Sequence, residues 1–429
     1  MSVRLAYLCG QYPRATDTFI QREVAALRAD GIHVEMISVR RPSALEFGSD
    51  EQQAERQATH YLLPCSPLRL ISDHLQLLLR SPLRYLRAVW TALTVRSPGI
   101  KSLFYQCFYF AEAGLVAMRL IRQDLQHVHN HSPDAGGYVT MLACKLADRT
   151  YSVTLHGFGI LAEPRRWNLQ EKLEGCLFAI CISQFTRSQA MLWTDRRFWD
   201  RFHVVHCGVD PERYVIRRHC GPGRQLLFVG RLDPVKGLPV LLQAMSALVT
   251  QRRDVHLHIA GDGPMRSDLE LLTAELGINA HVTFHGYLTQ SQLAERLQTA
   301  DVVVMTSFCE GIPVGLMEAM ACGVPVVAPR ITGIPELVDD GVSGYLTPCG
   351  DVDALVKSMD FLLESADMRQ RFGAAGRKKI ERDFHLATAA SMLSQIFSRR
   401  LSRETAEVPL GDVSAGAPAF CSRIGHRDT

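Results

Sequence analysis

Residues 309–337 read CEGIPVGLMEAMACGVPVVAPRITGIPEL and place two carboxylates, Glu310 and Glu318, eight positions apart among small and apolar residues. The run DVVVMTS just before them is typical of a buried strand, and Gly311 and Pro313 favour a turn followed by a helix. Glu310 should therefore precede this helix and Glu318 should lie within it. Eight residues of helix span about 12 Å, which is too far for the two acids to share one proton or one metal ion.

The two acids suit the two ends of a nucleotide sugar. A carboxylate accepts two hydrogen bonds, which matches a vicinal diol. Their separation is close to the reach from a ribose, across a diphosphate, to an attached sugar, so one acid could hold the ribose and the other the sugar. The alternative is a surface helix with two ordinary acids. It is disfavoured because the surrounding residues are those of a buried helix, where an unpaired carboxylate is costly.

The rest of the chain alternates short apolar runs with helical segments. The runs are VRLAYLC, HVEMISV, YSVTLH and FAICIS in the first half, and QLLFVG, VHLHIAG, HVTFHG, DVVVMTS and PVVA in the second. This alternation predicts parallel sheets covered by helices on both faces. A Pro/Gly/Arg-rich break at about 211–224 separates the two series. We therefore expect an α/β protein with two Rossmann-like, doubly wound domains facing across a cleft, with ligands at the carboxyl ends of the strands.

The predicted domain boundaries follow from this alternation of strand-like and helical segments. The N-terminal domain takes residues 1–212 and the C-terminal domain residues 213–382. A helix at 383–401 is expected to pack back across the domains. The tail at 402–429 is rich in Pro, Gly and Ser and aperiodic, so it is predicted to be disordered.

Composition narrows the class of protein. With 429 residues and 47% hydrophobic content, the chain is long enough for two full cores. A net charge of +3 is too small to indicate a nucleic-acid binder. The twelve cysteines are scattered without a CxxC pair, as expected for small hydrophobes in a reducing compartment. No cleavable signal opens the chain, so the expected location is the cytoplasm.

A second signal lies in RLDPVKGL, which follows the strand-like run QLLFVG and contains Arg231 and Lys236. Two cations beside a helix N-terminus form a good diphosphate site, because the fixed charges and the exposed N–H groups act together. Two solvated surface charges are the alternative for an isolated pair. The Gly-rich turns IAGDGP (259–264) and HGYL (285–288) follow two further strands.

Taken together, GRLDPVKG, IAGDGP, HGYL and the segment from Glu310 to Leu355 resemble the retaining glycosyltransferases of family 4, which have the GT-B fold. Glu310 and Glu318 meet the E-x7-E pattern of that family. The similarity is strong over about 225–385 and weaker in the first domain. The N-terminal PRATDTFI and a basic insert look most like the enzymes of colanic-acid and exopolysaccharide biosynthesis, which are hexosyltransferases.

The resemblance implies a position for each part of the donor. Arg231 and Lys236 would bind the diphosphate of a nucleotide sugar. Glu318 would hold the ribose hydroxyls, and Glu310, with the backbone that follows it, would hold the donor sugar. The residues of that following backbone are Gly311, Ile312, Pro313 and Val314.

The remaining implied contacts come from other loops. Gly286, Tyr287 and Leu288 would meet the base. In the first domain, Gly10 would approach the donor phosphates. His156, in TLHGFG, would lie at the catalytic centre beside the donor sugar and the acceptor, although a lone histidine at a strand end is more often structural.

The resemblance also implies a mechanism without a metal or another cofactor, because the two cations neutralise the leaving diphosphate. The departing phosphate oxygen would take the acceptor's proton on the same face of the sugar, so that positioning and electrostatics supply the catalysis. Two alternatives stay open. One is a nucleotide-sugar epimerase or phosphorylase of the same fold, and the other is a sugar-nucleotide-binding subunit without turnover.

Three other patterns point to different chemistry. GFGILA (157–162) matches a dinucleotide fingerprint, but Pro164 fits poorly with a helix there. HVHNH places His127, His129 and His131 on one strand face as a potential metal site, but no carboxylate or cysteine lies nearby in the sequence. Strand packing, with His131 near the cleft, is the preferred interpretation. DVD, after PCG, is interpreted as a helix cap.

The insert at 66–122 departs from a compact domain. It contains eight Lys and Arg residues against two acids, Asp73 and Glu112, and is rich in Leu, Trp and Tyr. Basic amphipathic helices of this kind bind the interface of anionic membranes. Glu112 interrupts its longest apolar stretch, so no transmembrane span is predicted. We expect peripheral contact with the inner face of the cell membrane and, from the resemblance, a lipid-linked glycan acceptor. Helices covering the first sheet, with solvated arginines, are the alternative.

Overall fold

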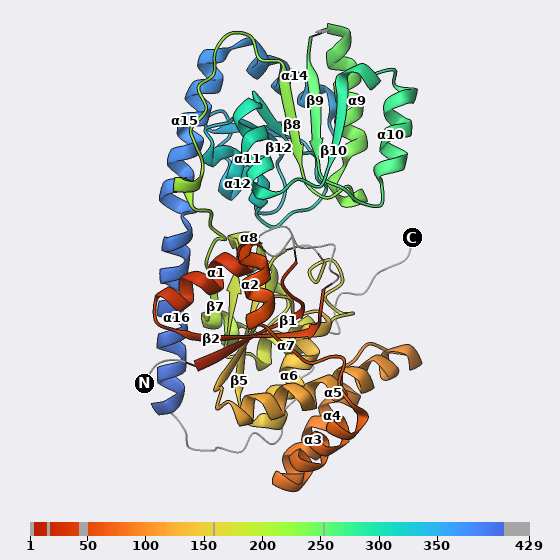
Figure 1. Cartoon of the computed structure of the whole chain (residues 1–429), viewed down its shortest axis with the longest axis vertical. Coiled ribbons are helices and arrows are strands. Elements are labelled where there is room, and N and C mark those ends of the chain that lie inside the picture. The colour runs from red at the N-terminus through yellow and green to blue at the C-terminus, as the bar shows by residue number, and fades with distance from the viewer. Residues whose placement is uncertain (1–3, 15–17, 43–49, 158, 252–253, 407–429) are drawn as a thin grey trace.

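The computed structural model describes residues 4–14, 18–42, 50–157, 159–251 and 254–406. In these residues the chain forms two parallel β-sheets of seven and six strands, each flanked by helices. Figure 1 shows the two sheets in separate domains, one above the other. The predicted fold class, two Rossmann-like α/β domains, is confirmed.

The N-terminal sheet has the strand order β3-β2-β1-β4-β5-β6-β7, with every neighbouring pair parallel. Its apolar runs are buried on both faces, as expected for strands under helical layers. The strands are β1 (Arg4–Gln11), β2 (His33–Arg40), β3 (His60–Tyr61), β4 (His127–Asn130), β5 (Thr150–Leu155), β6 (Phe178–Cys181) and β7 (Phe202–Val204). The helices of this half are α1 (Thr18–Ala29), α2 (Asp50–Ala58), α3 (Pro67–Arg80), α4 (Pro82–Thr94), α5 (Ile100–Arg122), α6 (Ala135–Ala147), α7 (Leu169–Gly175) and α8 (Gln184–Leu192).

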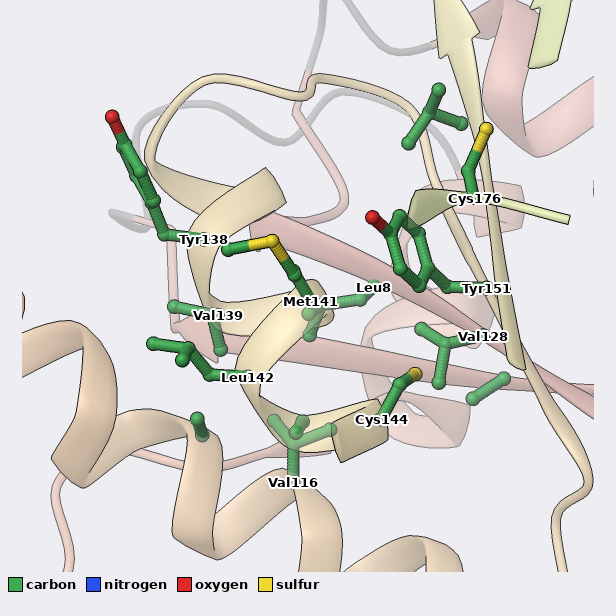
Figure 2. Close-up of a cluster of buried hydrophobic side chains, with 14 of the residues drawn as sticks. Leu8, Val116, Val128, Tyr138, Val139, Met141, Leu142, Cys144, Tyr151 and Cys176 are labelled. Carbon is green, nitrogen blue, oxygen red and sulfur yellow. The ribbon is translucent and has the colours of Figure 1, made fainter. Parts of the chain in front are cut away.

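Helix α6 is apolar on all sides because both of its faces are covered. Figure 2 shows its side chains between the sheet and α5, with Leu8 and Val128 on the sheet side and Val116 on the α5 side. Helix α3 packs on α5, and α4 packs on both α5 and α6. The three helices α3, α4 and α5 therefore form an outer layer beyond α6, and Figure 1 shows them projecting from the domain. None of the helices in the described segments has the length and hydropathy needed for a bilayer crossing.

The C-terminal sheet has the strand order β10-β9-β8-β11-β12-β13, again parallel throughout. Its strands are β8 (Gln225–Val229), β9 (His256–Ala260), β10 (Val282–Gly286), β11 (Val302–Val304), β12 (Val326–Pro329) and β13 (Gly344–Thr347). Its helices are α9 (Leu238–Gln251), α10 (Arg266–Glu275), α11 (Gln290–Thr299), α12 (Val314–Ala321), α13 (Ile334–Leu337), α14 (Val352–Glu364) and α15 (Ala366–Asp383). The strand order reverses at β8, which places β8 and β11 at the centre of the ligand-binding edge.

The last helix, α16 (Leu386–Ala406), returns to the N-terminal domain, where it packs on α1. Figure 1 shows α15 and α16 following one side of both domains. The turn between them is fixed by Val209, whose N–H donates to the carbonyl of Phe384 (3.0 Å) and whose carbonyl accepts from Leu386 (2.9 Å). Phe397 is fully buried in the same cluster as the β1 side chains. The chain is thus tied across the two domains at a second point.

The sequence-based division at residue 212 falls in a short 3-10 helix, η3 (Pro211–Arg213), between the last strand of the first sheet and the first strand of the second. The helix expected at 383–401 continues to Ala406. Most of the predicted tail, residues 407–429, lies outside the described residues.

Two of the competing sequence patterns have a structural explanation. The GFGILA segment after β5 is followed by turns, and the next helix, α7, begins only at Leu169. A dinucleotide fingerprint needs a helix directly after the strand, so this geometry does not fit one. In DVD, the Asp351 carboxylate accepts a hydrogen bond from the N–H of Ala354 (2.9 Å) at the start of α14. It is therefore a helix cap, as predicted.

Candidate active site

A cavity of about 670 Å³ lies between the two domains, at the carboxyl ends of the strands. Most of the predicted site residues line it. They are His156, Arg231, Lys236, Tyr287, Leu288, Glu310, Gly311, Ile312, Pro313, Val314 and Glu318. Gly10 and Gly286 do not line it; Arg14, a few residues after Gly10, does. Gly286 supports the cavity wall indirectly. Its carbonyl accepts a hydrogen bond from the N–H of Gly261 (2.8 Å), and its positive φ turns the chain toward Tyr287, which lines the cavity.

The two domains meet closely at one edge of this cavity. A Cβ atom on Gly311 would overlap the carbonyl oxygen of His156 and the side chain of Ile182. A Cβ atom on Gly157 would lie 2.8 Å from the Cα of Gly311, and Gly157 also has φ +104°. Only glycine permits this approach of one backbone to another. The approach sets the loop after β5 against the loop that carries Glu310.

Glu310 is held by a cation from a neighbouring loop. The Lys236 ammonium lies 2.6 Å from Glu310 Oε1, and the Ser307 hydroxyl donates to the same oxygen, also at 2.6 Å. The Lys236 and Glu310 side chains are only 20% and 10% exposed. A Cβ atom on Gly237, which has φ +61°, would overlap the Thr306 carbonyl oxygen, so the loop after β8 lies directly against the end of β11. The pair is a charge-assisted contact at the cavity wall.

Glu318 is anchored by the opposite domain. It lies on α12, and its Oε1 accepts from the Tyr214 hydroxyl (2.8 Å) and from Arg22 (3.4 Å). Arg22 is on α1, and Tyr214 is in the segment that joins the domains. Burial is the main cause that raises the pKa of Tyr214, and the nearby Glu318 carboxylate raises it further. Both bonds end on one oxygen, so Oε2 of Glu318 has no hydrogen-bond partner among the described residues.

Arg231 is the looser of the two predicted cations. Its side chain is 66% exposed, and its nearest carboxylate, on Asp233, is 3.7 Å away. It lines the cavity beside Lys236. A long exposed guanidinium can reorient toward a ligand at little cost, whereas Lys236 would have to exchange one partner for another.

His156 is the end of a hydrogen-bonded chain that runs into the first domain. Its Nε2 lies 2.9 Å from Nδ1 of His131, and Nε2 of His131 lies 3.1 Å from Oε1 of Glu23. The Tyr7 hydroxyl donates to the same Glu23 oxygen at 2.5 Å. Burial lowers the pKa of His156 well below its ordinary value, and the neighbouring His131 acts in the same direction.

The three histidines of HVHNH lie in two different environments. His127 and His129 are fully buried and bond to hydroxyls of β5, with His129 placed 2.8 Å from both Ser152 and Thr154. His131 lies behind His156 and does not itself line the cavity. In the described part of the chain, one group of side chains could hold a metal ion, namely Glu23, His129 and His131, with ligand atoms within 4.8 Å of one another. The sequence suggested no such carboxylate, because Glu23 is brought in from α1.

Sequence reasoning missed several cavity residues. Arg14 and Phe19 lie in the PRATDTFI stretch, which the sequence linked to a subgroup of the family but not to the cavity, and Cys207 lies after β7. Asp262 also lines the cavity, inside the IAGDGP turn that the sequence had identified without a role. Burial raises the pKa of the Cys207 thiol to about 12, so this thiol stays protonated and packs as a small hydrophobe.

Two family models match the chain one after the other. The model described as Glycosyltransferase Family 4 matches residues 17–213, and the model described as Glycosyl transferases group 1 matches residues 218–379. The first match covers the N-terminal domain from α1 onward, without β1, and the second covers the C-terminal sheet; the boundary between them lies in the segment that joins the domains.

Curated relatives extend over both domains. An amylovoran biosynthesis glycosyltransferase of Erwinia amylovora is 27% identical over 427 residues, which cover 92% of this chain and all of that protein. A putative colanic acid biosynthesis glycosyltransferase of Salmonella typhimurium is 33% identical over 195 residues, covering 43% of this chain and 48% of the relative.

Solved structures share the fold at low identity. Alr3699/HepE of Anabaena, solved in complex with UDP and glucose, superposes with a TM-score of 0.69 and 17% identity over 92% of this chain and all of its own. A sucrose-phosphate synthase from Thermosynechococcus elongatus gives a TM-score of 0.73 and 20% identity over 94% of this chain and all of its own. At such identities the likeness establishes the fold alone.

These comparisons give the epimerase alternative no support. The same assignment follows from the two consecutive family matches, from the two parallel sheets and from the cavity between the domains. The chain belongs to the glycosyltransferases and has the GT-B fold, with a family 4 domain followed by a group 1 domain.

Proposed function

We propose that this glycosyltransferase transfers a sugar, with retention of configuration and without a metal ion, from a nucleoside diphosphate sugar to a glycan of exopolysaccharide type. The observation that carries the proposal is the Lys236–Glu310 pair at the cavity wall. It joins a cation suited to a diphosphate with a carboxylate suited to sugar hydroxyls. The named relatives in amylovoran and colanic acid biosynthesis support the glycan class.

Donor binding would exchange the partners of this pair. When the diphosphate enters, the Lys236 ammonium turns to a phosphate oxygen, and Glu310 is released to accept hydrogen bonds from the donor sugar. Ser307 still donates to Glu310 and keeps the carboxylate in place. The exposed Arg231 closes on the phosphates from the open side. Alr3699/HepE of Anabaena, which shares this fold, has been solved in complex with UDP-glucose, and this agrees with the proposed class of donor.

Glu318 would hold the ribose through its second oxygen. Oε1 is already occupied by Tyr214 and Arg22. A ribose diol at Oε2 would complete the hydrogen bonding of the carboxylate, because each oxygen can accept two bonds. Since Arg22 belongs to the opposite domain, the nucleotide would bind where the two domains are already linked.

Retention follows when the acceptor attacks from the face that the diphosphate leaves. The departing phosphate oxygen takes the acceptor's proton, so no side-chain base is needed. The lowered pKa of His156 agrees with this, because a weakly basic imidazole is a poor proton acceptor at neutral pH. The rate would come from positioning and from stabilising charge on the diphosphate, which are the tasks of Lys236 and Arg231.

The test is a product analysis with a panel of nucleoside diphosphate sugars and lipid-linked glycan acceptors. We expect release of the nucleoside diphosphate only when an acceptor is present, and NMR of the product should show the anomeric configuration of the donor. Activity should persist in excess EDTA. An inverted product, or activity that EDTA abolishes and one metal ion restores, would contradict the mechanism.

We also propose that the enzyme works at the cytoplasmic face of an anionic membrane, where it would meet a lipid-linked acceptor. Support comes from the outer surface of α3, α4 and α5, which we name the apolar crest. It consists of large apolar side chains that are 47% to 80% exposed. They are Leu68, Ile71, Leu75, Leu79, Leu83, Leu86, Trp90, Leu93, Ile100, Phe104, Tyr105 and Phe108. Soluble proteins rarely leave so many large apolar side chains in contact with water on consecutive helices.

The charge of the crest also suits an anionic lipid surface. The two acids of this segment are turned inward, Asp73 to Arg122 (2.5 Å) and Glu112 to Arg40 (3.3 Å). The side chains of Arg80, Arg87 and Lys101 are exposed. The outer surface therefore combines apolar groups with cations and carries no exposed carboxylate on the three helices, which are described throughout. Interfacial helices have this composition.

The structure narrows which arginines can serve this purpose. Arg84 pairs with Asp148 (2.7 Å) and Arg119 with Glu35 (2.6 Å), so these two cations hold the insert to the domain, whereas Arg122 pairs with Asp73 within the insert. The cysteines in the described part of the chain are not joined by disulfides, which is compatible with a reducing, cytoplasmic location.

A further inference from the structure

We propose that Glu23 and His131 are positioning residues that hold His156 as a neutral imidazole with its proton on Nε2, so that its Nδ1 accepts a hydrogen bond from a hydroxyl of the bound substrates. This inference rests on the proposed function of the cavity. It assigns to the first domain a task in the transfer reaction that the motif pattern does not contain.

Glu23 sets the direction of the first hydrogen bond in this chain, and the second direction belongs to the arrangement that we infer. Glu23, as a carboxylate, can only accept, so the 3.1 Å contact requires a proton on Nε2 of His131. The inferred arrangement leaves a lone pair on Nδ1 of His131. The 2.9 Å contact with His156 is satisfied only when His156 carries its proton on Nε2. The remaining ring nitrogen of His156, Nδ1, is therefore an acceptor, and no protein partner occupies it among the described residues.

The surroundings hold the two rings in this arrangement. His131 is 4% exposed, and its ring lies nearly parallel to that of His156, with centroids 5.2 Å apart. The Phe19 ring packs against His156 at 4.8 Å and against His131 at 6.0 Å. Tyr7, fully buried, anchors Glu23 from the other side. Neither imidazole can turn over without displacing an aromatic neighbour.

The chemical consequence is a fixed polarity at the cavity wall. A hydroxyl of the donor sugar or of the acceptor could donate to His156 Nδ1 but could not accept from it. Placed this way, His156 orients a hydroxyl and carries no charge beside the departing diphosphate. Burial lowers the pKa of His156, which disfavours the doubly protonated ring.

The first measurement reads the tautomers directly. Protein labelled with ¹⁵N-histidine gives long-range ¹H–¹⁵N correlations that separate Nδ1–H, Nε2–H and doubly protonated rings. The His156→Gln variant would assign the His156 signals. At neutral pH and without substrate, we expect Nε2–H for both His131 and His156. An Nδ1–H tautomer of His156, or a doubly protonated His131, would overturn the proposal even in a protein with full transferase activity.

Two substitutions of Glu23 then separate hydrogen bonding from charge. Both Tyr7 and His131 reach the same oxygen, so Glu23→Gln can keep both bonds by placing its carbonyl oxygen there. We expect Glu23→Gln to retain the Nε2–H tautomers and most of kcat. Glu23→Leu removes the acceptor, so His156 should become a tautomer mixture and kcat should fall about tenfold, the effect of one lost hydrogen bond. The Kd of the nucleoside diphosphate should change less than about twofold.

Matched variants guard against a merely structural effect. His127→Leu removes an equally buried histidine from the same strand, outside hydrogen-bond reach of His156, and should leave the His156 tautomer unchanged whatever its stability. If Glu23→Leu fails to fold, His131→Phe tests the same link, with the same expected loss of a single tautomer. Equal losses of kcat in Glu23→Gln and Glu23→Leu would show that charge matters and would overturn the inference. Absence of any transferase activity, with the tautomers as expected, would refute the proposed function alone.

Discussion

The interdomain cavity and the apolar crest differ in what they leave unpaired. In the cavity, Glu310 and Glu318 are both at least 90% buried, and each has a partner, Lys236 for the first and Tyr214 with Arg22 for the second. On the crest, the two acids are buried and paired, and the large apolar side chains face water.

The difference concerns the kind of ligand that each region suits. In the cavity, internal partners stand where a polar ligand would bind, so binding exchanges one hydrogen bond for another and leaves no charge buried without a partner. On the crest, none of the described residues covers the apolar surface, and the gain on binding would come from removing that surface from water. Variants in the cavity should therefore change turnover or nucleotide affinity, and variants on the crest should change only where the protein is found.

The largest effect is expected for Lys236→Ala. Loss of the cation that meets the diphosphate should lower kcat by about 10²–10³-fold, the range seen when one electrostatic contact to developing charge is removed. Arg231→Ala should lower it by only about tenfold, because an exposed guanidinium contributes less than a buried, hydrogen-bonded cation. Steady-state kinetics at saturating donor would measure both. Equal losses in the two variants would contradict the different burial of the two cations.

Removing the partner of a buried carboxylate can also destabilise the fold. The control is the midpoint of thermal unfolding, which should drop more for Lys236→Ala than for Arg231→Ala, since only the former leaves Glu310 without its ion pair. Lys236→Met keeps most of the side-chain volume and separates packing from charge. If Lys236→Met restored turnover, the ammonium would have no electrostatic role.

The second largest effect is expected on the crest. Replacing Leu79, Leu83 and Leu86 with serine should weaken binding to anionic liposomes by about 100-fold, at roughly 1 kcal/mol for each leucine partly inserted into the interface. Co-sedimentation would measure the partition. Nucleotide affinity should not change, because these leucines lie on the outer layer beyond α6. If the partition of this variant onto anionic liposomes were unchanged, the proposed role of the apolar crest would be wrong.

The third prediction distinguishes the two acids of the cavity. Glu318→Ala should raise the Kd of the free nucleoside diphosphate by about tenfold, because its proposed ligand is the ribose. Glu310→Ala should leave that Kd nearly unchanged and lower kcat, because its proposed ligand is the transferred sugar. Calorimetry with the nucleotide alone would separate them. Equal effects on nucleotide affinity would contradict the assignment of one acid to each end of the donor.

Much of the donor side could be predicted because its signals are local. Lys236 and Glu310 each follow a buried strand within a few residues, so the sequence places both at the same edge of one parallel sheet. Their direct contact was not predicted. That contact depends on how closely two loops approach, and the approach is set by Gly237 against the backbone of Thr306.

Fewer site residues could be predicted in the first domain, and the reason is physical. Arg22 and Glu23 lie on α1 and Tyr214 lies in the segment that joins the domains, and all three reach the site only after α1 packs and the domains meet. Their side chains look like ordinary helix-surface or loop residues in the sequence. The crest was predicted as basic and amphipathic. Its sequence could not tell that Asp73 and Glu112 would fold inward and leave the leucines outside, since that depends on the packing of α3 and α5.

The smallest effect is expected for the exposed cations of the crest. Arg80→Gln together with Arg87→Gln should weaken liposome binding by less than about tenfold near physiological salt, although each cation near an anionic surface contributes ~1 kcal/mol before screening. Below about 20 mM salt the loss should grow, because the Debye length then exceeds the distance from the arginines to the lipid headgroups.

Arg84→Gln is the matched control for this last pair. Its guanidinium already pairs with Asp148, so we expect a smaller change in liposome binding than at Arg80 or Arg87. The serine variants of the crest should show the opposite dependence on conditions, with a loss that salt hardly changes, because removal of apolar surface from water is not screened. Binding that depends equally on all three arginines, and that salt abolishes completely, would assign the contact to charge alone and leave the exposed leucines without a role at the membrane.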